Sequence, residues 1–467
     1  MDDQQIIKEL VDKARAAQKQ VENYTQEQID EVCLSVAWQV YKDDNIAVCA
    51  NSAVEESGMG VYEDKLKKHK VKVGGVVRDI LKAKTVGVIE RDEATGITKY
   101  AKPVGVIGAL TPVTNPTATP ASNGVGILKG RNAVIFAPHP RAKKACKVAC
   151  DFMRKGLKQV GAPLDLVQSI EEPSIPRSQE LMRQVDLVLA TGGGAMVKSA
   201  YSSGTPSYGV GAGNPVIIVA EDADLADAAE KIRISKCFDN ATSCSSDNSI
   251  VIHESIFDRM VEELKKKGGY LCNDDEKAKL EKWMWIKNEE TGAVGLNLKI
   301  VAQSACKIAA DAGIDVPDTT KMLMVFGNGA GIDRYSGEKI SPVMALWKCQ
   351  SFDEALEMVM KMHEYAGLGH SAGLYTFNQD YIHKAAAALK VSRVLVRQAH
   401  APSAGGNLWN GMPSTVTLGC GTWGGNITTE NIHWKHFINV TWLSEPIEPA
   451  QITDEDLFGK HWTKYGK

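Results

Sequence analysis

Strand-like and helix-like segments alternate along residues 132–194, and this rhythm most constrains the fold. The strand-like runs cover residues 132–136, 166–170 and 187–190, and the helix-like runs cover 141–158 and 178–184. Parallel strands need long crossover connections, which are usually helices. The pattern therefore predicts an α/β fold in which helices cover a parallel sheet. A second α/β stretch is expected from about residue 214 to 425.

Three further segments have clear local signatures. Residues 4–60 carry apolar residues at helical spacing, and Thr25 begins a capping box that predicts a second helix there. A turn-forming stretch at 92–96 separates two strand-like runs, which predicts a β-hairpin followed by another strand at 104–109. The tail segment 436–443 has the pattern of one more strand.

Composition and charge exclude several classes of protein. The chain has 467 residues, of which 44% are hydrophobic and 24% charged, as in ordinary globular proteins. Its 54 basic and 57 acidic side chains leave a net charge of −3, so we expect no nucleic-acid or membrane partner. No apolar run approaches the roughly 18 residues that span a bilayer. Ten cysteines without a CxxC pair are typical of a reduced, cytoplasmic protein without a zinc site.

A glycine-rich turn is the first candidate for a binding role. Thr191, Gly192, Gly193 and Gly194 follow a predicted strand and precede a helical segment at 195–200. Glycines let backbone N–H groups approach a phosphate, and a helix N-terminus favours negative charge. The alternative is a tight strand-to-helix turn without a ligand, since the pattern is not GxGxxG.

Two loops have the composition of a catalytic site. Cys244 lies among small polar residues at 239–247, which give a thiolate access and nearby N–H dipoles; the alternative is a small hydrophobic residue without a catalytic role. Asn115 lies in a loop held by two prolines, where its amide can stabilise an oxyanion or form an Asx-turn. A third loop region, 405–426, is rich in glycine and is expected to line a site.

Taken together and in this order, the segments resemble the aldehyde dehydrogenase superfamily, and more narrowly its CoA-acylating branch. The matching pieces are residues 114–116, 129–132, 138–140, 190–193, 208–214 and 418–424. The resemblance implies a Rossmann-like cofactor-binding domain, an α/β catalytic domain with the nucleophilic cysteine, and a β-hairpin oligomerisation arm. The cofactor-binding domain would comprise residues 1–82 and 103–211, and the catalytic domain residues 212–435. The arm would comprise residues 83–102 and 436–450.

The resemblance also assigns roles to single residues. Cys244 matches the nucleophile, and Asn115 matches the amide that stabilises the oxyanion beside the Cys244 N–H. Glu338 matches the carboxylate that holds the nicotinamide ribose. The turn at 191–194 matches the segment near the cofactor pyrophosphate. NAD or NADP is the implied cofactor, and coenzyme A the implied cosubstrate.

One departure from the hydrolytic relatives indicates the reaction type. Those enzymes carry a water-activating glutamate where this chain has Gly209. A general base contributes about 10²–10⁴-fold, so without it a soluble thiol can compete with water for the thioester. The resemblance therefore implies oxidation of an aldehyde to its acyl-CoA through a thioester on Cys244, or the same reaction in reverse.

Cofactor preference and substrate stay open. The loop at 137–141 has no acidic residue, so His139 or Arg141 can pair with a 2′-phosphate or with CoA phosphates; the alternative is that neither contacts the cofactor. Arg397 and His400 lie near the substrate mouth in the resembled fold, which favours an acidic aldehyde such as sulfoacetaldehyde or succinate semialdehyde. If Arg397 instead points away, acetaldehyde or propanal become the expected substrates.

Competing functions remain in view. A hydrolytic aldehyde dehydrogenase is disfavoured by Gly209, and a non-catalytic assembly protein is disfavoured by the intact Cys244, Asn115 and Glu338. The first helix is expected almost at residue 4, without a leading peptide for entry into a microcompartment. The resemblance thus implies a free cytoplasmic enzyme that acts on a small aldehyde and CoA as a homodimer or homotetramer.

Overall fold

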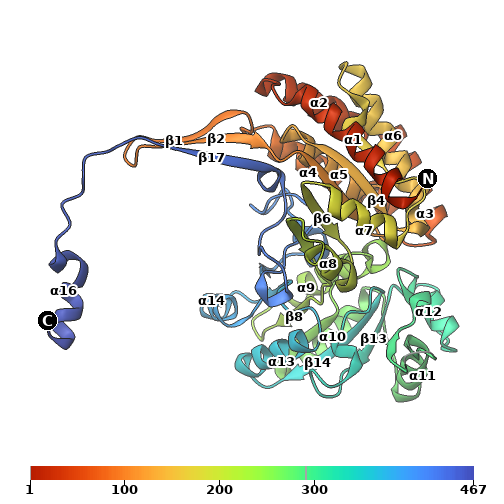
Figure 1. Ribbon diagram of the computed structural model, residues 1–467. Coiled ribbons are helices and arrows are strands. Elements are labelled where there is room, and N and C mark those ends of the chain that lie inside the picture. Colours follow the sequence, from red (N-terminus) through yellow and green to blue (C-terminus); the bar gives the residue numbers. More distant parts are fainter. Residues whose placement is uncertain (1, 290–291) are drawn as a thin grey trace.

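The computed structural model describes residues 2–289 and 292–467, and its body is built on two parallel sheets (Figure 1). The first sheet has five strands in the order β5-β4-β3-β6-β7, all parallel. Its strands are β3 Val106–Thr111, β4 Ala133–Pro138, β5 Val167–Ser169, β6 Leu187–Thr191 and β7 Ser207–Val210. The parallel sheet predicted from the alternation at 132–194 is therefore confirmed.

Helices surround this first sheet. Those before β3 are α1 Asp3–Val21, α2 Gln26–Gln39, α3 Asp43–Ser57 and α4 Tyr62–Ile80, and those between its strands are α5 Ala118–Lys129, α6 Lys143–Gln159, α7 Ile175–Gln184 and α8 Gly194–Tyr201. Helix α1 packs beside α7, and α2 packs on α5 and α6. The predicted capping box is present, because Thr25 and Gln28 exchange side-chain-to-backbone hydrogen bonds at the start of α2.

The second sheet has seven parallel strands in the order β10-β13-β14-β9-β8-β15-β16. Its strands are β8 Val216–Val219, β9 Ser249–His253, β10 Gly269–Leu271, β13 Met322–Phe326, β14 Val343–Cys349, β15 Ala372–Tyr375 and β16 Val394–Val396. Along β8, Val216 and Ile218 join one hydrophobic cluster while Ile217 and Val219 join another. Both faces of this sheet are thus buried, as expected of a parallel sheet.

Helices of the second part cover those two faces. They are α9 Leu225–Cys237, α10 Phe257–Lys266, α11 Asp274–Met284, α12 Ala305–Asp311, α13 Phe352–Tyr365, α14 Gln379–Ala388 and the single turn α15 His400–Ser403. A small antiparallel pair, β11 Trp285–Lys287 and β12 Val294–Leu296, follows α11. In the part of the chain that the structure describes, none of the helices combines the length and apolar character needed to cross a membrane.

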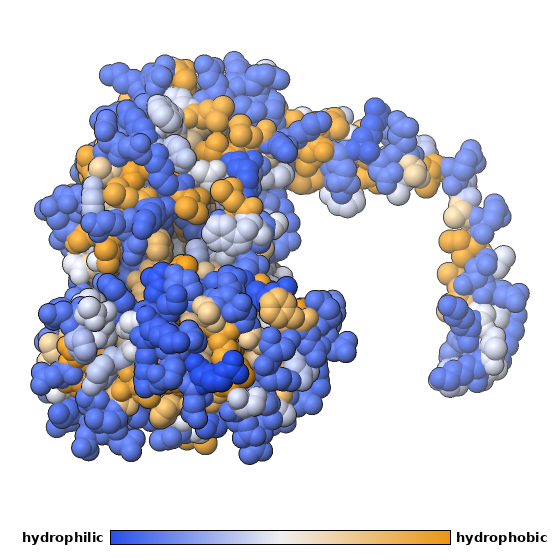
Figure 2. Space-filling view, turned by 180° about the vertical axis from the view of Figure 1, so that it is seen from behind, coloured by the Kyte–Doolittle hydropathy of each residue, from blue (hydrophilic) through white to orange (hydrophobic). Residues whose placement is uncertain are grey.

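A three-stranded antiparallel sheet extends away from the body as an arm (Figure 1). It pairs β1 Gly87–Asp92 with β2 Ile97–Pro103, and β2 with β17 Ile438–Ser444, which confirms the predicted hairpin and tail strand. The chain continues into a helix that the sequence did not predict, α16 Asp454–Tyr465, which has no buried residues. Apolar side chains are visible along the arm in Figure 2.

We expect the arm to join two copies of the chain. Val440 is 40% exposed and Trp442 is 64% exposed, and alternation along β17 puts both on one face. Exposed apolar side chains on an edge strand are typical of an interface. Changing both Val440 and Trp442 to Asp should convert the dimer or tetramer to monomer in light scattering at micromolar concentration. The Thr441→Asp change on the opposite face is the control, and a monomeric wild type would contradict the prediction.

Candidate active site

One cavity of about 830 Å³ lies where the two parallel sheets face each other. Loops that follow the carboxyl ends of β3, β4 and β6 bring Asn115, His139 and Thr191 to its wall. Loops that precede the amino ends of β9 and β14 bring Cys244 and Glu338 to the same wall. Residues expected from five separate sequence segments therefore meet in one space of the size that ligand sites occupy.

Cys244 is positioned by unusual backbone on the segment before it. Asp239, Asn240 and Ala241 follow one another with φ of 52°, 50° and 60°. These three left-handed residues turn the chain sharply after α9, at a conformational cost that the surroundings must offset. The loop also packs tightly from outside, because a Cβ on Gly213 would lie 1.9 Å from the Cys244 carbonyl oxygen. The nucleophile loop is thus held in one conformation.

A histidine that the sequence analysis missed contacts the cysteine. His370 Nε2 lies 3.3 Å from Cys244 Sγ, and His370 Nδ1 lies 2.7 Å from Ser371 Oγ. The same hydroxyl lies 2.8 Å from Nε2 of His400, so a chain of polar contacts runs from Cys244 to His400. The available signal was the segment at 367–373, in which small residues surround a histidine just before a strand.

The Ser371 hydroxyl controls which nitrogen of His370 carries the proton. It has one hydrogen, so it donates to one imidazole and accepts from the other. When it donates to His370 Nδ1, the proton of His370 is on Nε2 and faces the sulfur as a donor. When it accepts from Nδ1, Nε2 is free to take the thiol proton. Rotation of this hydroxyl, together with movement of the imidazole proton between Nδ1 and Nε2, therefore switches His370 between proton acceptor and hydrogen-bond donor toward Cys244.

The cysteine and histidine are both held in their neutral forms. Burial, and secondly the nearby Glu338, raise the pKa of the Cys244 thiol to about 12. Burial, and secondly Arg393, lower the pKa of His370 well below its ordinary value. The sequence analysis expected a thiolate stabilised by N–H dipoles, but burial outweighs those dipoles here. Cys244 therefore rests as a thiol and must give its proton to a neighbouring base as it reacts.

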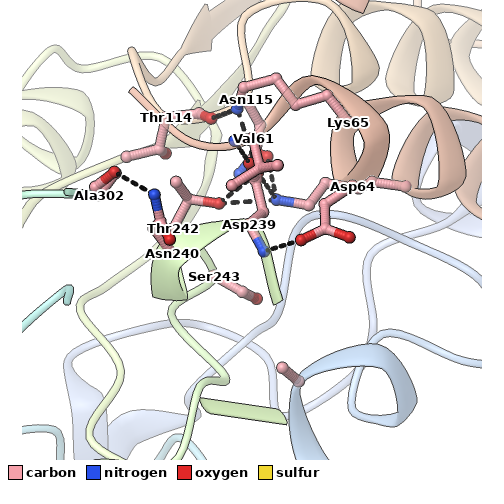
Figure 3. Close-up of polar contacts among 12 residues, drawn as sticks. Val61, Asp64, Lys65, Thr114, Asn115, Asp239, Asn240, Thr242, Ser243 and Ala302 are labelled. Atoms are coloured by element: carbon pink, nitrogen blue, oxygen red, sulfur yellow. Dashed lines mark hydrogen bonds and ion pairs between the residues drawn. The ribbon is translucent and has the colours of Figure 1, made fainter. Parts of the chain in front are cut away.

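Asn115 is held through the oxygen end of its amide. Lys68 of α4 donates from Nζ to Asn115 Oδ1 at 2.8 Å. Lys65, one turn earlier, donates to the Thr114 carbonyl at 3.1 Å (Figure 3). Because a lysine occupies the oxygen, the NH₂ group is the end of the amide available to a ligand in the cavity. This is the orientation that stabilisation of an oxyanion requires.

A single buried carboxylate ties these loops together (Figure 3). Asp239 is fully buried and accepts hydrogen bonds from Lys68 at 2.5 Å, Lys65 at 3.1 Å, the Thr242 hydroxyl at 2.6 Å and the Val61 amide at 2.8 Å. Its pKa is held below the ordinary value, since the two ammonium groups and these hydrogen bonds outweigh burial. Asp239 thereby fixes the nucleophile loop to α4 and to the loop of Asn115.

The predicted cofactor residues divide into two groups. Thr191, Gly192 and Gly193 line the cavity at the N-terminus of α8, whereas Gly194 is the first residue of that helix and does not line it. A Cβ added at Gly193 or Gly194 would meet nothing within 4 Å, so the turn is open on its outer side. This open turn beside a helix N-terminus fits a dinucleotide phosphate.

Of the other predicted cofactor contacts, His139 and Glu338 line the cavity and Arg141 does not. His139 lines the cavity, while Arg141 points elsewhere and donates from Nη2 to the Ser57 carbonyl at 3.2 Å. Burial, and secondly Arg141, lower the pKa of His139, so the ring is neutral at pH 7. Among the described residues, Glu338 is the only carboxylate that lines the cavity, and burial raises its pKa to about 8.

The comparisons with known proteins agree with one another. The sequence model described as "Aldehyde dehydrogenase family" matches residues 1–284. The chain is 57% identical to a sulfoacetaldehyde dehydrogenase of Acholeplasma sp, covering 98% of this chain and 94% of the relative. It is 52% identical to the sulfoacetaldehyde dehydrogenase (acylating) of Bilophila wadsworthia, covering 99% of each. An acetylating aldehyde dehydrogenase from Geobacillus thermoglucosidasius superposes with a TM-score of 0.91 at 34% identity, over 97% of this chain and 98% of that structure.

The chain belongs to the aldehyde dehydrogenase family, in its acylating branch. In this aldehyde dehydrogenase, Gly209 lies on β7 with no room for a side chain. A Cβ there would lie 2.6 Å from Val197 Cγ1 and 2.9 Å from the Tyr201 ring. The Tyr201 hydroxyl also bonds to both the amide and the carbonyl of Gly209, at 3.0 and 3.2 Å. A glutamate at this position would displace packed side chains.

The two residues expected at the substrate mouth of the dehydrogenase do not line the cavity. Arg397 follows β16 at the carboxyl edge of the second sheet, whereas Cys244 lies at the amino edge. Its guanidinium donates to the Thr376 carbonyl at 2.5 Å and stacks over the Phe377 ring. His400 is buried and faces Ser371, so the structure links it to Cys244 through His370.

The neutral thiol predicts a steep pH dependence of alkylation. With a pKa near 12, the thiolate fraction of Cys244 grows tenfold with each pH unit across pH 7–9. The rate of inactivation of the dehydrogenase by iodoacetamide, measured without cofactor, should rise by about the same factor. Peptide mapping of the modified site, with Cys244→Ala as control, checks that Cys244 is the target. A plateau below pH 9 would instead indicate a preformed thiolate–imidazolium pair.

The contact chain predicts graded losses of activity. His370→Ala removes the proton acceptor and should lower kcat by about 10²–10⁴-fold. Ser371→Ala keeps the imidazole but frees its Nδ1 atom, so kcat should fall less and the acidic limb of the pH profile should shift. Ser392→Ala is the matched control, since that hydroxyl makes no hydrogen bond to any described residue. Full activity in His370→Ala would remove His370 from the mechanism.

Proposed function

We propose that the enzyme oxidises sulfoacetaldehyde to sulfoacetyl-CoA, reducing a nicotinamide dinucleotide, through a thioester on Cys244. The observation that carries this proposal is the contact of Cys244, which lines the cavity, with the buried His370, together with the glycine at position 209 in place of the water-activating glutamate. The names of the two relatives at 57% and 52% identity supply the aldehyde. Succinate semialdehyde, acetaldehyde and propanal are the alternative substrates.

The first half-reaction forms the thioester. His370 takes the thiol proton as Cys244 Sγ bonds to the aldehyde carbon, which gives a tetrahedral hemithioacetal. The Asn115 NH₂ group and the Cys244 amide hydrogen-bond to the oxyanion of that species. The nicotinamide cofactor, when bound, accepts the hydride. Collapse of the hemithioacetal leaves the acyl group on sulfur, oxidised by two electrons relative to the aldehyde.

The second half-reaction transfers the acyl group to CoA. The CoA sulfur bonds to the acyl carbon, the bond to Cys244 breaks, and the cysteine recovers a proton from His370. Before this step His370 releases to solvent the proton that it took from Cys244 in the first half-reaction, and the neutral imidazole then accepts the CoA thiol proton, so the same residue serves both halves. In support, a propionaldehyde dehydrogenase of Rhodopseudomonas palustris, 27% identical to this chain, has been solved with bound CoA and an acylated cysteine.

The cavity wall fits the two large ligands. The open turn at Thr191, Gly192 and Gly193 would hold the dinucleotide pyrophosphate, and Glu338 would hold the nicotinamide ribose. His139 would lie near the adenosine. Four lysines and one arginine line the cavity against one carboxylate, which favours ligands with several negative charges. A nicotinamide dinucleotide and CoA are therefore the proposed cofactor and cosubstrate. The residues that line the cavity are compatible with either NAD or NADP.

The proposed reaction predicts strict dependence on CoA. Purified enzyme should reduce NAD⁺ or NADP⁺ with sulfoacetaldehyde in the presence of CoA, and slow by about 10²-fold or more after one turnover without it, since a general base for water is missing. Absorbance of the reduced cofactor and mass spectrometry of the acyl-CoA give the readouts. Cys244→Ala should abolish both. Steady turnover to the free acid without CoA would place the enzyme in the hydrolytic class.

A further inference from the structure

The cationic side chains that line the cavity are not equivalent. Lys67 pairs with Asp64 at 3.9 Å, Lys68 with Asp239 at 2.5 Å, Lys70 with Asp43 at 2.7 Å, and Arg78 with Asp79 at 2.7 Å. Lys72 lines the same cavity and has no carboxylate within 4.0 Å among the residues that the structure describes. Its ammonium makes one hydrogen bond, to the Gly405 carbonyl at 3.2 Å.

An ammonium without a counter-ion in this position is costly. Burial, and secondly the neighbouring Lys68, lower the pKa of Lys72 to about 8. Lys72 is partly buried, and a charge withdrawn from solvent is costly unless it is paired and hydrogen-bonded. Of the three N–H donors on this ammonium, one is used by Gly405, and the remaining donors lack an acceptor among the described residues. An anionic ligand in the cavity would supply both the missing charge and the missing acceptors.

Lys72 lies on the same wall of the cavity as the residues around the oxyanion site. It lies one turn after Lys68 on the same face of α4, and Lys68 holds Asn115 of the oxyanion site. One helical turn rises about 5.4 Å, so Lys72 follows Lys68 along the same wall of the cavity. Cys244 lines the same cavity as Lys72. Its charge therefore lies along the cavity wall where the tail of a Cys244-bound aldehyde would lie.

We propose that Lys72 binds the sulfonate of the aldehyde substrate and so selects anionic over neutral aldehydes. This inference rests on the proposed function and names the residue that reads the substrate tail. A sulfonate presents three tetrahedrally arranged oxygens, and an ammonium is a compact charge with rotatable donors that suits such a group better than the planar fork of an arginine. From the sequence we expected Arg397 and His400 in this role, but neither residue lines the cavity.

The test compares an anionic and a neutral aldehyde in Lys72→Met. With saturating CoA and cofactor, kcat/KM for sulfoacetaldehyde should fall by about 10- to 100-fold, the effect of losing a charge-assisted hydrogen bond. The kcat/KM for propanal should stay within about threefold or rise, because propanal offers no charge to Lys72. Lys72→Arg keeps the charge and should retain part of the preference. Its folding and activity also guard against a trivial loss of structure in Lys72→Met.

Lys70→Met is the matched control. Lys70 is on the same helix and lines the same cavity, but its ammonium faces Asp43 and the Tyr41 ring. Its removal should leave the ratio of the two kcat/KM values unchanged.

Three results would overturn the proposal. Equal losses for both aldehydes would give Lys72 a structural role, and a rise confined to the KM of CoA would assign it to the CoA phosphates. An unchanged ratio in Lys72→Met would exclude it from recognition of the tail. Failure of the wild type to convert sulfoacetaldehyde with CoA would instead refute the proposed function, so the two failures are distinguishable.

Discussion

The geometry of the active site depends on the buried carboxylate of Asp239. Its oxygens hold Lys65 and Lys68 of α4, and those lysines in turn hold the carbonyl of Thr114 and the amide of Asn115. The same residue begins the left-handed backbone that leads to Cys244. Removing the carboxylate would leave two buried ammonium groups without a partner, which is far more costly than the pair is stabilising. The relative placement of nucleophile and oxyanion donor is thus set by an ion-pair network that holds both loops.

Local signatures in the sequence were sufficient to predict several of the helices, strands and turns around the active site and in the arm. The hairpin at 85–101, the capping box at Thr25 and the strand-turn-helix at 187–200 depend on contacts between neighbours in the chain, so a short window contains the information. The same holds for Cys244 and Asn115, because small neighbours and flanking prolines mark their loops as accessible. Resemblance to a known family supplied their roles, and the structure brings both to one cavity wall.

The remaining site residues depend on strand order, which no short window contains. His370 precedes β15 and Cys244 precedes β9, and the two residues are 126 positions apart in the sequence. In the parallel sheet only β8 lies between these two strands, so both residues lie at the same amino edge and can meet. Arg397 follows β16 and therefore lies at the carboxyl edge, opposite the cysteine. Lys72 is one of several lysines on one helix, and the sequence does not distinguish it from Lys70. In the structure Lys70 pairs with Asp43, whereas no described carboxylate pairs with Lys72.

Burial explains the reluctance of the Cys244 thiol to ionise, and packing around Gly209 explains the choice of acyl acceptor. Burial raises the pKa of the thiol to about 12, and contact of Val197 and Tyr201 with Gly209 leaves no space there for a glutamate that would activate water. An acceptor must therefore bring its own nucleophile and give its proton to the one neutral base in contact with the sulfur, His370. A thiol meets that demand more readily than water, since its pKa lies several units lower. The lack of space for a water-activating glutamate at position 209 is thus a physical reason for acylation of CoA in place of hydrolysis, whichever aldehyde fills the cavity.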